Sequence, residues 1–323
     1  MSLYIGLDLG GTNLKYALGD ERGTIITKSM RPSQAQESRE KIFENMFLAV
    51  EELLKIAKQK AERVAAIGVG SPGSVDFEKG QLIGPTPNIK AWTDAPIKET
   101  LEARFHIPVW ADNDANVVAI AEARLGAGKG LKHLVCLTVG TGIGGGIIID
   151  GQIYRGENYT AAEIGHMSIE VAGKKCNCGG IGCLEVYTSA PAMVERYREK
   201  LEKTSQPWPE EKLSTELIFE RMKAGDILAL ETLNETCDYF GAGIASVVNV
   251  LNPQAVIIGG GVAEAGEEFI GRVREVVKRR AMKAATKNLQ ILKAQLGNDA
   301  GVVGAILIAA EQCRAIKTCG EME

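Results

Sequence analysis

Residues 3–18 read LYIGLDLGGTNLKYAL, and this stretch indicates the fold class. Apolar residues alternate with small or polar residues up to Leu9, a Gly-Gly-Thr turn follows, and the alternation then resumes. That order is typical of two strands joined by a glycine turn. A related pattern, LVCLTVGTGIGGGIIIDG, occupies residues 134–151 and closes with Asp-Gly, a dipeptide favoured in hairpin turns. The repeat predicts a duplicated α/β architecture with one β-rich core in each half.

Helical periodicity is strongest outside these two stretches. Apolar residues recur at helical spacing along residues 38–59, which predicts an amphipathic helix. Further helices are predicted at 113–125, 190–203, 213–224, 226–251, 266–281 and 301–315, and short strands at 64–69, 109–111 and 255–258. The Gly- and Pro-rich residues that lead to Trp92 are expected to form loops or short hairpins. We expect the Ala-rich last helix to pack back on the first domain.

Length and composition limit the class of protein. The chain has 323 residues, of which 45% are hydrophobic and 24% charged, as is ordinary for a soluble protein of two domains. The net charge of -4 argues against nucleic acid as the main partner. No apolar run reaches transmembrane length and no signal peptide precedes the first strand, so we expect no membrane partner and a cytoplasmic location.

One short segment is unusually rich in cysteine. Three cysteines fall within eight residues, and a histidine lies ten residues upstream. The four candidate ligands are His166, Cys176, Cys178 and Cys183. One imidazole and three thiolates suit a closed tetrahedral Zn²⁺ site, and the intervening glycines let the backbone fold tightly around an ion. We expect His166 and the flanking carboxylates of Glu163 and Glu185 to face a polar ligand. The alternative is that the cysteines pack as small buried hydrophobes.

Three glycine-rich turns follow predicted strands, at residues 10–12, 140–142 and 259–261. Backbone N–H groups at such turns can approach a phosphate because no Cβ intervenes. None of the turns matches the P-loop or the dinucleotide-binding pattern, and each alone is equally consistent with a structural turn. Together they predict a nucleotide held between two domains. The candidate nucleotide-binding residues are Gly10, Gly11, Thr12, Lys15, Thr141, Gly142, Gly260 and Gly261.

Asp8 lies near the end of the first predicted strand, just before the first glycine turn. Its carboxylate is placed to hold Mg²⁺ directly or through water, beside phosphate oxygens that Thr12, Lys15 and Thr141 could bind. The alternative is a carboxylate that caps its own turn.

Asn113 and Asp114 lie where a predicted strand meets a predicted helix. Ligand sites of α/β proteins tend to lie at the carboxyl ends of strands, and a carboxylate there could accept the proton of a substrate hydroxyl as general base. The alternative is simpler, because Asn and Asp are favoured helix N-caps. Asn88, in the Pro-rich loop, is expected either to reach the same site or to be an ordinary turn residue.

These motifs resemble those of the ROK family of repressors, open-reading-frame proteins and sugar kinases, over almost the whole chain. The segments that carry the resemblance are DLGGTNLK at 8–15, NDAN at 113–116, GTGIGGG at 140–146, EIGH at 163–166 and the cysteine segment up to Glu185. The first and third are shared with the wider superfamily of actin, hexokinase and Hsp70. The pattern from His166 to Glu185 is far more specific to ROK proteins.

The resemblance implies two actin-like, ribonuclease H-like ATPase domains around a central cleft. Residues 1–112 would form a small N-terminal α/β domain, completed by 301–323, and residues 113–300 would form a large α/β domain that carries the zinc loop 166–183. A hexose and ATP with Mg²⁺ would meet between the domains, and the zinc would be structural. The resemblance also suggests a homodimer or homotetramer.

The resemblance assigns roles to single residues as well. Asp114 corresponds to the base that deprotonates the sugar hydroxyl, and His166 with the three cysteines corresponds to the zinc ligands. The residues implied in sugar binding are Asn88, Asn113, Asp114, Glu163, His166 and Glu185. One position departs from the pattern: many members have glycine directly before the Glu-Ile-Gly-His motif, where this chain has Ala162. The added methyl group could alter the sugar pocket.

Three functions compete at this point. The first is ATP-dependent phosphorylation of a hexose, with glucose as the expected acceptor, although kinases for N-acetylmannosamine, N-acetylglucosamine, mannose, fructose and allose share these motifs and polyphosphate could replace ATP. The second is a sugar-sensing repressor, which would carry a helix-turn-helix domain ahead of Asp8, where a strand that begins by residue 3 leaves no room. The third is an Hsp70- or actin-like ATPase that binds protein, which would not explain the cysteine segment.

Overall fold

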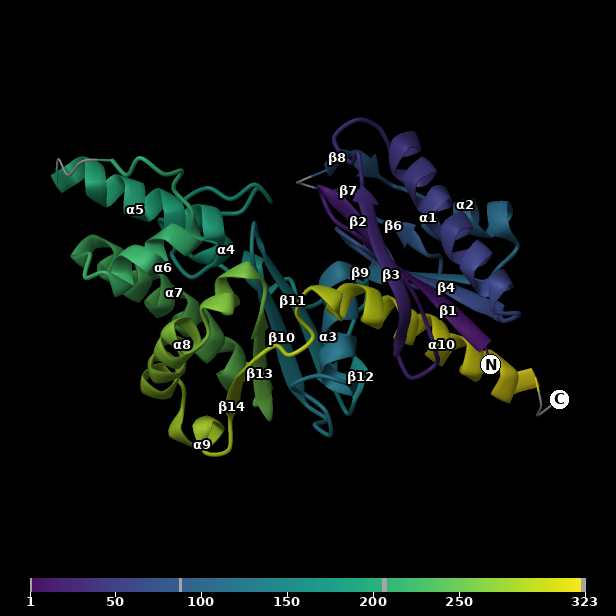
Figure 1. Ribbon diagram of the computed structural model, residues 1–323. Coiled ribbons are helices and arrows are strands. Elements are labelled where there is room, and N and C mark those ends of the chain that lie inside the picture. The colour runs from purple at the N-terminus through teal and green to yellow at the C-terminus, as the bar shows by residue number, and fades with distance from the viewer. Residues whose placement is uncertain (1, 87–88, 205–207, 321–323) are drawn as a thin grey trace.

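The computed structural model describes residues 2–86, 89–204 and 208–320. These residues form two five-stranded sheets, each with its own helices, and Figure 1 shows the two halves side by side. In each sheet the first three strands pair antiparallel and two further strands join parallel to the first. The shared topology confirms the predicted duplication. None of the helices among these residues is long and apolar enough to span a bilayer.

The first sheet has the strand order β3–β2–β1–β4–β9. Its strands are β1 Ser2–Leu9, β2 Asn13–Gly19, β3 Ile25–Pro32, β4 Arg63–Ser71 and β9 Val109–Asn113. Side chains alternate between the faces of a strand, so both faces of β1 can be buried. Leu3, Ile5 and Leu7 pack with α1 (Arg39–Gln59) and α2 (Ile97–Phe105), whereas Tyr4 packs with the C-terminal helix.

The second sheet has the strand order β12–β11–β10–β13–β14. Its strands are β10 Leu134–Val139, β11 Ile143–Ile149, β12 Gln152–Ile153, β13 Ala255–Gly259 and β14 Gln290–Lys293. The helices of this half are α4 Glu185–Thr188, α5 Ala190–Thr204, α6 Thr215–Lys223, α7 Ile227–Leu251, α8 Glu267–Arg280 and α9 Lys283–Thr286. One face of β10, through Val135 and Leu137, shares a large core with α5 to α8.

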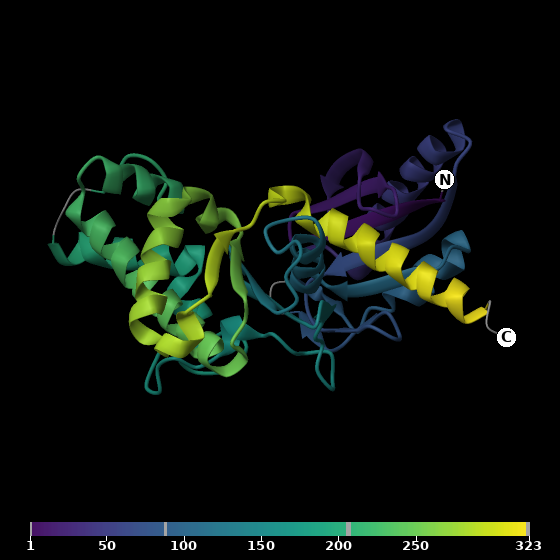
Figure 2. The same cartoon turned by 90° about the horizontal axis from the view of Figure 1, so that it is seen from below.

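Two helices connect the halves, α3 (Asp114–Arg124) and α10 (Ala300–Gly320). α10 lies along the first sheet, and α3 packs between α10 and the second sheet (Figure 2). Backbones approach closely here: a Cβ on Gly68 of β4 would collide with the backbone oxygen of Ala305, and one on Gly304 with that of Val117. The expectation that the last helix packs back on the first half is confirmed. The division into 1–112 plus 301–323 and 113–300 stays a prediction.

Most of the remaining elements are short. The Gly- and Pro-rich stretch forms two small hairpins, as predicted, from β5 Val75–Asp76 with β6 Gln81–Leu82 and from β7 Pro85–Thr86 with β8 Ile89–Thr93. The 3₁₀ turns are η1 Ile164–His166, η2 Gly261–Ala265 and η3 Gly297–Asp299. Among the longer elements, β3 and α2 were not predicted. The four-residue strand β14 was not predicted either. β3 exposes most of its side chains, α2 buries only Ile97 and Leu101, and β14 has four residues, so none carries a strong periodic pattern.

Candidate active site

Asp8 lies near the carboxyl end of β1, before the turn at residues 10–12. That turn closes through a bond from Gly10 N–H to Asn13 O of 2.9 Å, which does not use the Asp8 side chain. The Asp8 carboxylate instead packs against Gly301 in the first turn of α10, and Lys15 Nζ lies 4.0 Å from its Oδ2. Burial raises the pKa of Asp8 more than the Lys15 charge lowers it. A buried carboxylate of this kind is suited to a hard cation such as Mg²⁺.

Asn113 and Asp114 occupy the junction of β9 and α3, as predicted. Asn113 Oδ1 caps α3 by accepting the N–H groups of Ala115 at 2.9 Å and Asn116 at 3.2 Å, and its Nδ2 donates to Gly73 O at 3.0 Å. The N-cap interpretation therefore holds for Asn113. Asp114 is the first residue of the helix, and its Oδ1 accepts the Ala115 N–H at 2.8 Å.

The electrostatic surroundings of Asp114 set it apart from a surface carboxylate. Burial is the largest of the causes that raise its pKa to about 7, and the negative charges of Asp8 and Glu163 raise it as well. β4 lies between β1 and β9, and a Cβ on its Gly70 would lie 3.8 Å from both Asp8 Oδ1 and the Asp114 Cα, so both acids lie close to the end of β4. Asp114 as a whole is half-buried. A carboxyl group with these properties can accept a proton near neutral pH.

The loop that carries Glu163 approaches this region from the second half. Glycines on β11 permit the approach from both sides: a Cβ on Gly146 would collide with Ala119 of α3, and one on Gly145 with the backbone oxygen of Ala162. Ala162 has a φ of 67°, in the left-handed region that favours glycine. The methyl group that distinguishes this chain therefore lies on a strained residue, next to Glu163.

The predicted zinc ligands come together in the fold. The ligand atoms of His166, Cys176, Cys178 and Cys183 all lie within 4.8 Å of one another. Cys178 Sγ and Cys183 Sγ are 3.7 Å apart, and Cys176 Sγ is 3.7 Å from His166 Nδ1. Bond lengths of about 2.0–2.3 Å place the ligands of a tetrahedral Zn²⁺ roughly 3.5–3.8 Å from one another. The donor set and its spacing fit the ion.

Short backbone pairings hold the cysteine segment in shape. Lys175 bridges to Ile181, and Ser168 bridges to Cys183. The Gly180 N–H donates to Cys178 Sγ at 3.4 Å and lowers the pKa of that thiol, whereas burial raises the pKa of Cys183 to about 12. A buried thiol of this kind is protonated at neutral pH, so binding of Zn²⁺ would release its proton.

The two ring nitrogens of His166 face different groups. Nδ1 faces the cysteines, and Nε2 lies 4.0 Å from Glu163 Oε2. One imidazole can therefore bind a metal through one nitrogen and contact a polar ligand through the other. Burial raises the pKa of Glu163 most, His166 lowers it and Glu185 raises it, so the three side chains share one site.

Glu185 connects this group to a glycine turn. It begins α4, and its Oε2 accepts the N–H of Ile143 at 2.8 Å. A Cβ on Gly142 would collide with the same carboxylate. Glu185 therefore lies beside the 140–142 turn, and a side chain at residue 142 would displace its carboxylate.

The two remaining glycine turns leave the same edge of the second sheet. β10 and β13 pair in parallel, with Thr138 opposite Gly259, so the turns that follow them are neighbours. Gly260 has a φ of 87°, and a Cβ there would collide with the backbone of Val139. Thr141 is exposed. These placements agree with a nucleotide site at this edge, and the roles of the individual residues stay predictions.

The structure does not bring every predicted residue to the site. Asn88 lies outside the described residues. Three charged residues at the junctions between the halves were missed, namely Asp112, Glu122 and Arg155. Asp112 and Glu122 are 1% and 0% exposed, and Glu122 accepts N–H groups from Ala127, Gln295 and Leu296 at 2.8–3.1 Å. The one sequence signal was an acidic residue inside the apolar run of β9.

The two matched sheets and the polar site at their strand ends define a protein of the actin-like ATPase fold class. The chain belongs to the ROK family, whose model matches residues 4–312.

Relatives of known name include kinases and regulators. The chain is 34% identical over 314 residues to a glucokinase of Thermotoga maritima, covering 95% of this chain and 97% of that one. It is 32% identical over 307 residues to a xylose repressor of Caldicellulosiruptor bescii, covering 94% of this chain and 76% of the repressor. Among solved structures, a ROK family glucokinase of Streptomyces griseus in complex with glucose and AMPPNP superposes with a TM-score of 0.82 at 33% identity, covering 96% of this chain and 100% of that one.

Proposed function

We propose that this chain is an ATP-dependent hexokinase that converts glucose to glucose 6-phosphate. The proposal is carried by the environment of Asp114. Its carboxyl group follows β9 and has a pKa raised to about 7, in part by the charge of Glu163. The similarity to glucokinases over nearly the whole chain supports the same activity.

Asp114 would act as the general base of the transfer. Its carboxylate accepts the proton of the sugar hydroxyl while that oxygen forms a bond to the γ-phosphorus of ATP, and the bond to the β–γ bridging oxygen breaks to release ADP. The proton would then leave to solvent once the product has been released. Because phosphoryl transfer needs little covalent help from protein, most of the rate would come from holding hydroxyl and phosphate in line.

The remaining residues would bind and orient the two substrates. Sugar hydroxyls would be bound by Asn88, Asn113, Glu163, His166 and Glu185. The phosphates would be bound at Gly10, Gly11, Thr12, Lys15, Thr141, Gly142, Gly260 and Gly261. Asp8 would hold the Mg²⁺ that accompanies ATP, directly or through water.

Zn²⁺ would be structural, held by His166, Cys176, Cys178 and Cys183. A closed set of four protein ligands leaves no open position for substrate, so the ion supplies rigidity rather than a nucleophile. Bound through Nδ1, the His166 ring would be fixed with its Nε2 toward Glu163, and the two sugar-binding side chains would keep a constant separation.

A sugar-binding regulator is the second candidate, because xylose repressors match nearly the whole chain. A regulator needs to bind sugar but has no use for a base with a pKa near neutral. The raised pKa of Asp114 therefore favours the kinase. Assembly into a homodimer or homotetramer stays a prediction.

The test is release of ADP from Mg-ATP with a panel of sugars: glucose, mannose, fructose, allose, N-acetylglucosamine and N-acetylmannosamine. We expect the highest kcat/KM with glucose. A higher value with an N-acetyl sugar would keep the reaction and change the substrate. No turnover with any sugar, from protein that binds glucose, would contradict the kinase proposal and favour the regulator.

A further inference from the structure

Arg155 begins the loop that leads from β12 to Glu163. Its backbone oxygen accepts the Ala161 N–H at 3.0 Å, so the loop between these residues is closed at its base. The Arg155 side chain leaves the second half of the chain and reaches residues of the first half. This contact of Arg155 with the first half matters for the candidate active site.

The Arg155 guanidinium makes two kinds of contact with the first half. Its Nε and Nη2 donate to Asp112 Oδ2 at 2.9 and 2.7 Å. Its Cζ lies 3.7 Å from the centroid of the Phe77 ring, over the ring face. Asp112 is 1% exposed and the Arg155 side chain 20% exposed, so the ion pair is removed from solvent on one side and is stronger than a surface pair.

The Asp112 carboxylate also forms hydrogen bonds with the start of α3. Its Oδ1 accepts the backbone N–H of Asn113 at 2.8 Å and the Asn116 Nδ2 at 2.9 Å. One carboxylate therefore joins Arg155 to Asn113, which directly precedes Asp114, and to Asn116 in the first turn of α3. Arg155 lies eight residues before Glu163, so a single ion pair connects the base of the Glu163 loop with the helix start that carries Asp114.

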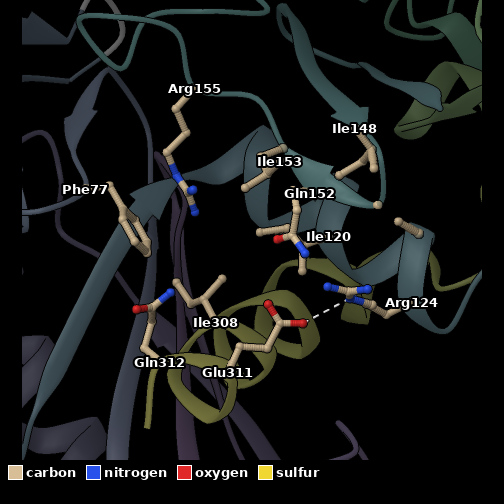
Figure 3. A pocket seen from close by; sticks show the side chains of 12 residues that line it. Phe77, Ile120, Arg124, Ile148, Gln152, Ile153, Arg155, Ile308, Glu311 and Gln312 are labelled. Carbon is tan, nitrogen blue, oxygen red and sulfur yellow. Dashed lines mark hydrogen bonds and ion pairs between the residues drawn. The ribbon is translucent and has the colours of Figure 1, made fainter. Parts of the chain in front are cut away.

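Apolar packing also reaches the loop, because Tyr159 packs against the cluster that contains Phe77 and Trp110, but it is incomplete beside Arg155. A cavity of about 50 Å³ lies beside Arg155, between α3, the β11–β12 hairpin and α10, and Figure 3 shows Arg155 and Phe77 at one side of it. Across the same cavity Arg124 forms an ion pair with Glu311, which joins α3 to α10 and does not touch the Glu163 loop (Figure 3). The two arginines thus line one cavity but hold different elements.

We infer that Arg155 is a positioning residue, which through Asp112 and Phe77 fixes the Glu163 loop against the Asn113–Asp114 junction and so sets the sugar-binding geometry. The inference rests on the proposed function for its substrate. Loss of the ion pair frees the loop at its base, and Glu163 no longer keeps a fixed place relative to Asp114. Binding of sugar suffers first, because the glycine turns that would bind ATP are on other loops.

Kinetics of four variants test the inference: Arg155→Gln, Asp112→Asn, the double variant, and Arg124→Gln as the matched control. For each of the first three we expect the glucose KM to rise by about tenfold or more, with the ATP KM within about twofold, because small misplacements of binding groups cost this much. The double variant should be no worse than the worse single variant, since both remove the same contact. Arg124→Gln should keep both KM values.

Three results would overturn the inference. One is an unchanged glucose KM with only a lower kcat, which would indicate less folded enzyme and a merely structural role. Another is a double variant whose losses multiply, which would mean that Arg155 and Asp112 act separately. The third is an equal rise in glucose KM in Arg124→Gln, which would assign the effect to the cavity as a whole.

Hydrogen exchange separates this inference from the proposed function. Backbone amides of residues 156–163 should exchange faster in Arg155→Gln and Asp112→Asn than in wild type or Arg124→Gln, whether or not the wild type phosphorylates any sugar. A wild type without turnover would overturn the kinase proposal alone. Unchanged exchange in both variants would overturn the positioning role alone.

Discussion

At the residue scale, Asp114 combines two properties that usually exclude each other. Burial and the charges of Asp8 and Glu163 make its ionised form costly, yet the residue is only half-buried. A base needs a pKa close to the working pH and access to its proton donor, and Asp114 has both. The end of β9 positions the Asp114 carboxylate, and the neighbouring acids Asp8 and Glu163 cause part of the rise in its pKa.

This raised pKa predicts the pH dependence of the free enzyme. Below its pKa of about 7, Asp114 is protonated and cannot accept the sugar proton, so kcat/KM for glucose should fall about tenfold per pH unit on the acid side of neutrality. The measurement is kcat/KM from pH 5 to 9, with circular dichroism at each pH to confirm that the protein remains folded. A kcat/KM that stays constant from neutral pH down to pH 5 would contradict the electrostatic account.

Ala162 offers a second test at this scale. Its φ of 67° strains an alanine but not a glycine, so Ala162→Gly should stabilise the protein by about 0.5–1 kcal/mol. Ala161, which is not among the residues with positive φ, is the matched control, and Ala161→Gly should be neutral or destabilising. Urea unfolding of both variants makes the comparison. A loss of stability in Ala162→Gly would mean that its methyl contacts outweigh the strain.

At the element scale, we predict that the loop 166–183 owes its order to zinc bound at its four candidate ligands as well as to the packing of Met167 and Ile169 on the large core. Cys178 is exposed, so burial contributes little there and a metal ion would supply the order. Cys178→Ser should therefore lower bound zinc from about one equivalent to well below it and raise the glucose KM through His166. Cys313→Ser, a change to a cysteine on α10, should retain zinc. Metal analysis beside kinetics checks both, and zinc-free wild type with full glucose affinity would remove the metal from the account.

The strand–turn–strand motifs at 3–18 and 134–151 could be predicted because alternation and glycine are local signals. The cysteine ligands were also predictable, because they lie close in sequence to one another. β14 and α2 were missed because they are short and weakly patterned. The contact of Arg155 with Asp112 spans 43 residues and two sheets, and no spacing in the sequence indicates it.

At the scale of the whole molecule, Glu122 binds the segment that leads from β14 to α10, residues 294–299 (the passage). Its fully buried carboxylate on α3 accepts N–H groups of Gln295 and Leu296, where the chain leaves the second sheet for the first. Lys15 and Lys28 of the first sheet also reach this passage, through Asn298 O and Asp299 Oδ2. A change here therefore acts on the relative placement of the two halves.

Removal of this carboxylate should be costly. Glu122→Ala leaves three N–H groups without their charged acceptor, so we expect a loss of about 3 kcal/mol in the free energy of unfolding, and a smaller loss in Glu122→Gln, which keeps one acceptor oxygen. Glu311→Gln, on the exposed ion pair with Arg124, should cost under about 1 kcal/mol. Urea unfolding of the three variants decides, and equal losses in all of them would contradict a special role for Glu122.

We propose Asp114 as the base of a sugar kinase, and one substitution tests this role directly. Asp114→Asn keeps the size and the helix-start position of the side chain but cannot accept the proton, so glucose affinity by calorimetry should stay within about threefold of wild type while kcat falls at least about a hundredfold. Asp238→Asn, a surface change on α7, should leave both unchanged. Turnover by Asp114→Asn close to that of wild type, with glucose bound equally well, would contradict the account.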